Sequence, residues 1–191
     1  MLSAAACNQW WMENILKSGD FSGEQAHVSQ LGNNPVLFAP YLMGERTPHN
    51  DTAVRGAFVG LSLDTSRGQM TQAVLEGVAF AFRDALEIAR SVGAEVRRAT
   101  VCGGGAKSPV WRHILANVLN IPMDYIQTEG PAMGAAMLAA KGCDACGSLE
   151  ELAARTVQVT DTAFPDAEIV RRYEARYPVF RALYPTLRTL T

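Results

Sequence analysis

Three consecutive glycines, Gly103 to Gly105, separate an apolar segment from an amphipathic one in the sequence VCGGGAKSPVWRHIL. Glycine has no Cβ atom, so it permits positive φ angles and lets a ligand lie against the main chain. In α/β folds, ligands bind beyond the carboxyl ends of strands, at the loops that lead into helices. Ser108 and Pro109 have the residue types of an N-cap and a first helical position. The segment predicts a strand over 98–102, a tight turn, and a helix from Pro109 that points at an open cleft.

The glycine segment matches neither of two familiar phosphate-binding patterns. It lacks the spacing of the G-x-x-x-x-G-K-[ST] loop, although Lys107 and Ser108 imitate its ending, and it is not G-x-G-x-x-G. Taken alone, it fits a nucleotide site and a plain turn equally well. A second segment of small residues, 129–132, follows the next predicted strand, and two neighbouring strand ends of this kind favour a shared cleft. The Ser108 hydroxyl has two roles open to it there, capping the helix or contacting a ligand.

The four cysteines suggest no metal or redox chemistry. Cys143 and Cys146 form an isolated C-x-x-C pair after a predicted helix that ends at Gly142. A zinc site usually needs a second pair or suitably spaced histidines, and the three histidines are scattered along the chain. We therefore expect the pair to be dispensable and assign no metal ligand. Cys7 and Cys102 stand among apolar neighbours and are expected to be buried.

Five aspartates are candidates for a catalytic base by residue type alone. Asp84 lies near the end of a strongly predicted helix, beside Arg83. We expect its side chain to lie on the surface or to form an ion pair. Asp51 lies in the polar loop GERTPHNDTAV, where capping or turn formation is favoured over a role facing a cleft. In the same loop, a pairing of Glu45 with Arg46 would hold the loop's shape. We assign no catalytic residue among the five, which are Asp51, Asp64, Asp84, Asp124 and Asp144.

Hydrophobic periodicity and capping signals give the elements that must position these groups. Ser66 followed by Gln69 is a capping-box pattern, and apolar residues then recur at steps of three and four until Gly93. The order strand, helix, strand, helix in the second half favours parallel strands and an α/β layer architecture. The predicted helices are 1–18, 66–93, 109–119, 129–142 and one capped by Ser148; the predicted strands are 36–43, 55–63, 98–102 and 123–127; residues 19–25 are predicted as a loop.

An aromatic stripe marks the carboxy-terminal segment. Tyr173, Tyr177, Phe180, Tyr184 and Leu187 recur at steps of four and three. This spacing is typical of a helix face that docks on the rest of a fold, and we assign it no chemistry. Two prolines, at 178 and 185, are expected to interrupt or kink this helix.

Composition and charge exclude several classes of function. The chain has 191 residues, 48% of them hydrophobic, and its 17 Lys and Arg against 19 Asp and Glu give a net charge of −2. This balance provides no basic field for nucleic acid or anionic lipid, so we expect neither partner. The sequence also shows neither a secretory leader nor a long uncharged apolar segment. A cytoplasmic location is the expectation.

Several motifs together resemble one family. They are similar to the carboxy-terminal domain of the FGGY carbohydrate kinases, and within that family most to xylulokinases. The resemblance runs in register over residues 1–142 and is only loose beyond. The motifs are PYLMGERTPHND (40–51), RGAFVGL (55–61), AVLEGVAFAFRD (73–84), CGGGAKSPVWRHILANVL (102–119) and EGPAMGAAMLAA (129–140).

The resemblance implies a fold and a domain organisation. It implies an α/β domain of the ribonuclease H-like type found in actin and hexokinase, with a mixed sheet flanked by helices. Residues 1–191 would form one carboxy-terminal kinase domain, with a motif-bearing core over 1–142 and terminal helices over 143–191. An amino-terminal, sugar-binding domain would be absent from this chain.

The resemblance also implies an activity, ATP-dependent transfer of the γ-phosphoryl group to D-xylulose. The alternatives are a kinase for another ketose or polyol, such as ribulose, glycerol or fuculose, and a non-catalytic module that retains the fold. The expected partners are a small sugar and ATP, and a homo-oligomer is compatible with the resemblance. The family's general base, its acidic Mg²⁺ ligands and its phosphate-contacting loop would lie upstream, so this chain alone is expected to be inactive.

The nucleotide-binding residues follow from the same resemblance. The segment from Gly103 to Ala106 would be the adenosine motif, and the opening helix would pass close to the nucleotide. That helix is also expected to expose apolar surface at Trp10, Trp11 and Ile15. The residues expected at the cofactor are Gly103, Gly104, Gly105, Ala106, Ser108, Ala5 and Gln9.

Overall fold

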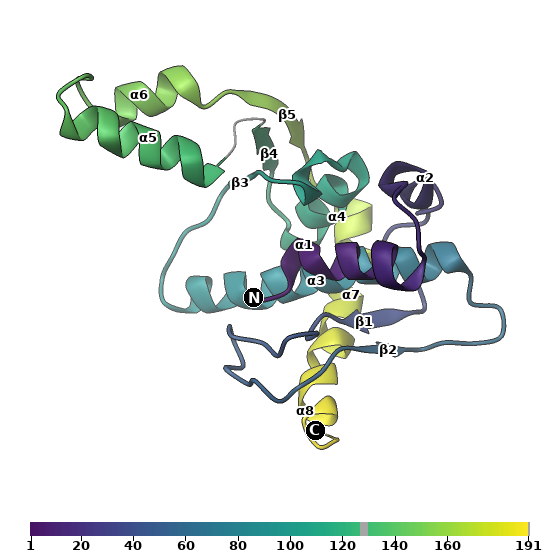
Figure 1. Cartoon of the computed structure of the whole chain (residues 1–191). Coiled ribbons are helices and arrows are strands. Elements are labelled where there is room, and N and C mark those ends of the chain that lie inside the picture. Colours follow the sequence, from purple (N-terminus) through teal and green to yellow (C-terminus); the bar gives the residue numbers. More distant parts are fainter. Residues whose placement is uncertain (127–129, 191) are drawn as a thin grey trace.

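The computed structural model describes residues 1–126 and 130–190, apart from the side chain of Pro131 (Figure 1). The predicted end of one strand at Gln127, and Glu129 in the second small-residue segment, lie outside the described residues. The described helices are α1 (Ala4–Trp10), a π-helical turn (Trp11–Ile15), α2 (Phe21–Gln25), α3 (Arg67–Ser91), a 3-10 turn (Gly105–Lys107), α4 (Pro109–Leu119), α5 (Gly130–Gly142), α6 (Leu149–Thr156), α7 (Ala167–Arg181) and α8 (Leu183–Leu187).

The strands form two small sheets in a mixed α/β fold. β1 (Leu37–Ala39) pairs antiparallel with β2 (Ala57–Val59). β3 (Ala99–Val101) pairs parallel with β4 (Met123–Ile126), which confirms the predicted parallel strands. β5 (Val159–Ala163), which we did not predict, adds antiparallel to the other edge of β4. The segment after residue 142 thus contributes a strand as well as helices.

Helix α3 is the scaffold on which the other elements pack. Its start is the predicted capping box, in which Ser66 and Gln69 satisfy each other's backbone N–H groups. A run from Thr71 to Ala81 is buried on all sides, because α1, α4, α7 and β1 all contact this helix (Figure 1). A helix enclosed in this way has an apolar surface wider than one stripe, as its sequence indicates.

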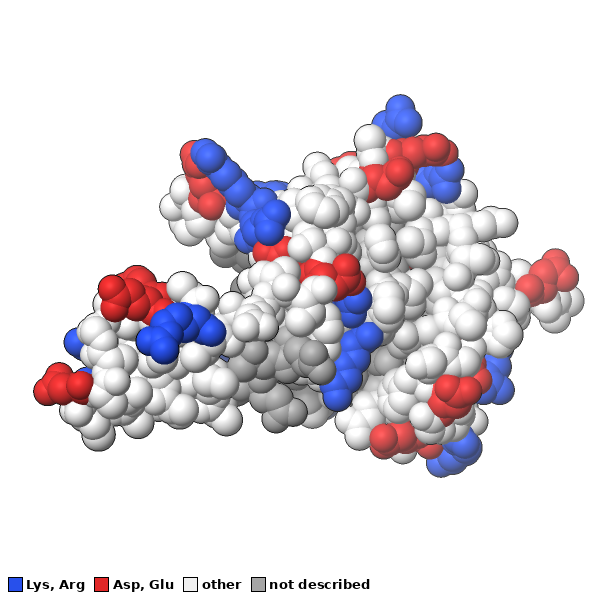
Figure 2. All heavy atoms as spheres, turned by 90° about the horizontal axis from the view of Figure 1, so that it is seen from above, with Lys and Arg blue, Asp and Glu red and all other residues white. Residues whose placement is uncertain are grey.

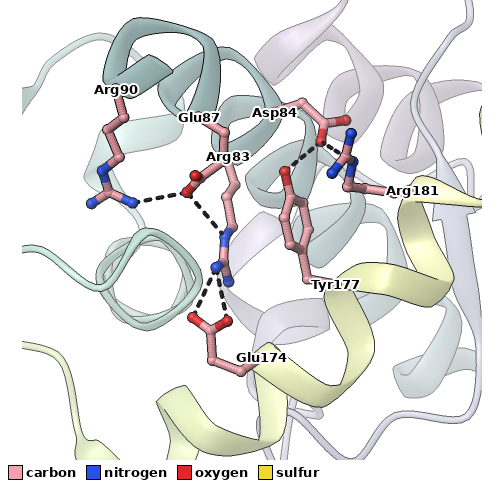
Figure 3. Close-up of polar contacts among 7 residues, drawn as sticks. All are labelled: Arg83, Asp84, Glu87, Arg90, Glu174, Tyr177 and Arg181. Atoms are coloured by element: carbon pink, nitrogen blue, oxygen red, sulfur yellow. Dashed lines mark hydrogen bonds and ion pairs between the residues drawn. The ribbon is translucent and has the colours of Figure 1, made fainter. Parts of the chain in front are cut away.

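The aromatic stripe of α7 docks on α3, as predicted. Phe80 stacks on Phe180 with 5.1 Å between ring centroids. The Tyr177 hydroxyl donates to Asp84 Oδ1 at 2.6 Å, and Figure 3 shows this bond beside the ion pair of Arg83 with Glu174 at 2.8 Å. Burial raises the pKa of the Asp84 carboxyl. Asp84 is therefore a buried pairing residue that ties the two helices together.

Three local predictions were wrong, and one was confirmed. Residues 21–25 form a helix within the predicted loop, because Asp20 Oδ1 accepts from the Gly23 amide and caps it. Trp11 is only 3% exposed, and Cys102 is exposed where a buried residue was expected. The last helix is interrupted at Ala182, between Pro178 and Pro185, as the two prolines predict, although Pro178 itself lies inside α7.

Helices α5 and α6 pack on one another and project away from the rest of the fold (Figure 1). α5 exposes small and apolar side chains, including Leu138 at 64%. Figure 2 shows acidic and basic side chains interspersed over one face of the molecule, most of which is uncharged. Within residues 1–126 and 130–190, no helix combines the length and apolar character needed to cross a membrane.

Candidate functional site

A cleft of about 690 Å³ lies between α1, α2 and the glycine turn that precedes α4. Its volume falls in the range typical of small-molecule sites, about 300 to 1,000 Å³. Five of the seven residues predicted at the cofactor line it, although they come from two distant parts of the chain. The lining residues are Ala5, Asn8, Gln9, Glu13, Phe21, Ser22, Gln25, Ala26, Gly104, Gly105, Lys107, Ser108, Pro109, Val110 and Trp111.

The three glycines have different structural roles. Gly103 has a φ of +85°, so it supplies the backbone turn at the end of β3. A Cβ atom on Gly104 would meet nothing within 4 Å, which means that this position opens onto free space at the cleft. A Cβ atom on Gly105 would stand 2.6 Å from Cζ3 of Trp111 and 3.4 Å from Cβ of Ala5. Gly105 therefore allows the turn to pack between α1 and α4.

The back of the turn is held by Arg112, away from the cleft. Arg112 Nη1 donates to the Ala106 carbonyl at 2.6 Å, and Nη2 donates to Asp161 Oδ2 at 2.6 Å. The hydrogen bond from Arg112 to Asp161 holds the pKa of the Asp161 carboxyl below its usual value. Ala106 is buried and, like Gly103, is not among the lining residues. The turn is thus fixed to β5 from behind while Gly104 faces the open side.

Ser108 joins two walls of the cleft. Its hydroxyl oxygen accepts from the Trp111 amide at 3.1 Å, so it caps α4 as its sequence position predicts. The same hydroxyl donates to Gln25 Oε1 at 2.6 Å and so ties α2 to the start of α4. With Pro109 at the first helical position, the positive end of the α4 dipole lies at the cleft, beside the exposed Lys107.

Two tryptophans fix the walls of the cleft to successive turns of α3. The Trp11 indole N–H, next to α1, donates to Thr71 Oγ1 at 3.0 Å. The Trp111 indole N–H, on α4, donates to the Leu75 carbonyl at 3.0 Å. Because Thr71 and Leu75 are one helical turn apart, α3 sets the spacing between α1 and the glycine turn.

Helix α2 forms a wall that sequence reasoning missed. Phe21, Ser22, Gln25 and Ala26 line the cleft, and Glu24 pairs with Arg67 at the start of α3. The N-cap aspartate at position 20 was the available signal, but the glycines and short length of GDFSGEQ favoured a loop. The polar lining from α1 and the π-helical turn was also only partly anticipated, since Asn8 and Glu13 were not predicted beside Gln9.

The candidate aspartate Asp51 lies outside this cleft and shapes its own loop. Its Oδ1 accepts from the amides of Ala53 at 2.8 Å and Val54 at 3.2 Å, and its Oδ2 accepts from the Tyr184 hydroxyl at 3.1 Å. These donors lower the pKa of the Asp51 carboxyl. This is the turn-forming role favoured from the sequence.

Two other predicted side-chain roles can be located. Glu45 is buried, and its Oε1 accepts from the backbone amide of Arg46, so the expected pairing of the two side chains is replaced by a backbone bond. Cys143 and Cys146 are free cysteines. Among the described residues, no group of three His, Cys, Asp or Glu side chains is placed to hold a metal ion.

Comparison with known proteins shows which family has this arrangement. Residues 3–143 match the carboxy-terminal domain of the FGGY family of carbohydrate kinases. The chain belongs to this family. It is 35% identical over 193 residues to a xylulose kinase of Staphylococcus epidermidis, covering 100% of this chain and 39% of that protein. It is 36% identical over 190 residues to the xylulose kinase of Escherichia coli K12, covering 98% and 39%.

A solved structure of an FGGY relative has the same fold. The crystal structure of a xyloylose kinase from Brucella ovis superposes with a TM-score of 0.85 at 36% identity, covering 100% of this chain and 40% of that one. This chain thus spans about two fifths of the length of the relatives that it matches. As an FGGY domain, it has the mixed α/β architecture seen in these kinases.

Proposed function

We propose that this chain is the ATP-binding domain of a sugar kinase, and that the cleft between α1, α2 and the glycine turn holds the nucleotide. The ribonuclease H-like type of its sheet and its role as a single domain over 1–191 are part of this proposal. The observation that carries it is the convergence of Ala5 and Gln9 with Gly104, Gly105 and Ser108 on one cleft. The family resemblance expects these residues at the adenosine.

The chemistry of the cleft suits a nucleotide. Apolar walls from Phe21, Val110 and Trp111 offer a surface for a flat base, and Gly104 lets a ligand approach the main chain. The ammonium group of Lys107 and the amino-terminal end of α4 supply positive charge for phosphate oxygens. In this scheme the chain binds and orients the nucleotide, which is a large part of what a phosphoryl-transfer enzyme contributes.

The remaining catalytic parts are assigned to the portion of an FGGY kinase that this chain lacks. Mg²⁺ bridges the phosphates in phosphoryl transfer and neutralises developing charge. Following the family resemblance, we expect its ligands and the general base upstream of this chain. We propose D-xylulose as the phosphoryl acceptor because of the named relatives, with another ketose or polyol as the alternative. The cytoplasmic location also stays a prediction.

A calorimetric titration with ADP and ATP tests the nucleotide site. We expect weak, saturable binding to the 191-residue chain. Replacement of Gly104 with valine should weaken it about tenfold or more, because the side chain enters the space at the cleft. Gly142→Val is the matched control, since Gly142 is exposed at the end of α5 and a Cβ atom there also meets nothing within 4 Å. Equal affinity in the wild-type chain and both variants would refute this placement of the nucleotide.

A further inference from the structure

Asn8 is the one lining residue whose buried side chain is left without a hydrogen bond among the described residues that face the cleft. It lies on α1, is only 4% exposed, and lines the cleft between Ala5 and Gln9. Its Oδ1 atom is buried and has no partner. Buried side-chain amides normally have at least one partner, so an unpaired one beside a cleft calls for an explanation.

The neighbouring polar side chains are already paired with one another. Gln9 Nε2 donates to the Glu13 carboxylate at 3.1 Å, and the Ser108 hydroxyl donates to Gln25 Oε1 at 2.6 Å. These pairs account for the other amides on the walls of the cleft. Asn8 alone offers an uncommitted carbonyl and amino group there, on the helix that lies against Gly105.

We propose that the Asn8 amide recognises the base of the nucleotide, by hydrogen bonds to the edge that carries the 6-amino group of adenine. This inference rests on the proposed nucleotide site and adds to it the residue that reads the base. A side-chain amide has an acceptor and donors side by side, and adenine has a 6-amino donor beside ring-nitrogen acceptors. The same pairing of Asn with adenine is common in protein–DNA recognition.

The surroundings of Asn8 favour recognition over a purely structural role. A structural amide in a core normally satisfies both of its polar atoms within the protein, whereas Asn8 makes no side-chain hydrogen bond to any described residue. The apolar side chains of Phe21, Val110 and Trp111 line the same cleft, and Asn8 itself is only 4% exposed. A hydrogen bond from Asn8 to a ligand in such a place discriminates strongly, because a ligand without the matching group leaves the amide unpaired.

The test compares two diphosphates that differ in one group. ADP carries the 6-amino group, and purine riboside 5′-diphosphate lacks it. We expect the wild-type chain to bind ADP about tenfold more tightly than the purine analogue. This first comparison uses only the wild-type chain, so it does not depend on the folding of a variant. In Asn8→Leu, this preference should disappear, and ADP affinity should fall to that of the purine analogue. The melting temperature of Asn8→Leu should stay the same or rise, since leucine has similar size and removes an unpaired polar group.

Asn14→Leu is the matched control, because Asn14 is exposed on the next turn and does not line the cleft. It should keep the preference for ADP. A wild-type chain that binds no ADP overturns the proposed nucleotide site, and the role of Asn8 with it. A wild-type chain that binds both diphosphates equally, or an Asn8→Leu chain that keeps the preference, overturns the role of Asn8 alone.

Discussion

Gly104 and Gly105 are neighbours in sequence, but their α-carbons face different surroundings. Gly104 has a φ of −59°, which any residue adopts, and opens onto free space. Gly105 is pressed against the Trp111 ring, which is itself buried and bonded to α3. The first glycine is thus available to a ligand, whereas the second is required by the packing of the turn.

Alanine substitutions should separate these two roles. Gly105→Ala should lower the free energy of unfolding by about 1–3 kcal/mol, because the added methyl group overpacks against Trp111. Gly104→Ala should leave it unchanged or raise it by up to about 1 kcal/mol, since alanine restricts the unfolded chain. Urea unfolding of both variants gives the comparison. Equal destabilisation by the two would show that the turn does not pack as described.

Asp51 gives a second residue-scale prediction, on pH dependence. Its carboxylate accepts two backbone amides, which lower the folded-state pKa. The stability that it contributes is therefore complete above the unfolded pKa of about 3.9 and is lost as pH falls through the lower folded value. Asp51→Asn should be less stable than wild type at neutral pH, and the two unfolding curves should converge in acid.

Urea midpoints measured from pH 7 downwards test this prediction. Asp64→Asn is the control, because Asp64 is exposed and its carboxylate has no hydrogen bond within the described part of the chain. A constant gap between wild type and Asp51→Asn at every pH would show that the carboxylate charge has no part in the loop.

At the scale of elements, α3 decides where the cleft forms. Trp11 and Trp111 bond to positions one turn apart on this helix, and the elements beside them become opposite walls. Arg112 and Ser108 then fix the turn and α2 in place. The site is thus positioned by a buried scaffold, which is the arrangement that holds a binding geometry most precisely.

Removing the hydrogen bond from the Trp11 indole to Thr71 tests how far the fold around the cleft depends on α3. Trp11→Phe leaves the hydroxyl of the fully buried Thr71 without its partner, so we expect a loss of about 1–3 kcal/mol in stability. The double variant with Thr71→Val should lose less than the sum of the two single variants. Strict additivity, measured by urea unfolding, would mean that the bond contributes nothing.

Local signals in the sequence predicted part of this organisation well. The capping boxes at Ser66 and Ser148, and the Ser108-Pro109 start of α4, involve contacts within one turn, so the sequence contains all the necessary information. β5 was missed because its VTDTA segment is mostly polar and exposed and becomes a strand only by pairing with β4.

The residues that line the cleft were also only partly predicted, whereas their role in binding a nucleotide stays a proposal. The glycine turn has a recognisable sequence pattern, and Ala5 and Gln9 on the opening helix were named from the family resemblance. The contribution of α2 depends on the bond from Ser108 to Gln25, which joins residues 83 positions apart. The unpaired state of Asn8 depends on what surrounds it in three dimensions. Neither is visible in a sequence read locally.

At the scale of the whole molecule, the chain is an FGGY carboxy-terminal domain that spans about two fifths of the relatives' length, and we propose that it supplies only the nucleotide site of a kinase. The 191-residue chain alone should therefore show no sugar-dependent ATP consumption. A full-length version, built by adding the preceding part of a related xylulose kinase, should consume ATP with D-xylulose as its best acceptor. A coupled assay of ATP consumption, run with a panel of ketoses and polyols, compares the 191-residue chain with the full-length version. Robust phosphorylation by residues 1–191 alone would return Asp51 to consideration as the base.

The most direct test of the central claim is to map ADP onto the chain by ¹H–¹⁵N amide NMR. The proposed site predicts that the largest shifts on titration fall at Ala5, Gln9, Gly104, Gly105 and Ser108, while the amides of β1 and β2 remain unchanged. Absence of any shift at millimolar ADP, or shifts centred on another surface such as the polar cleft beside Gln69 and Gln72, would contradict the claim that this cleft binds the nucleotide.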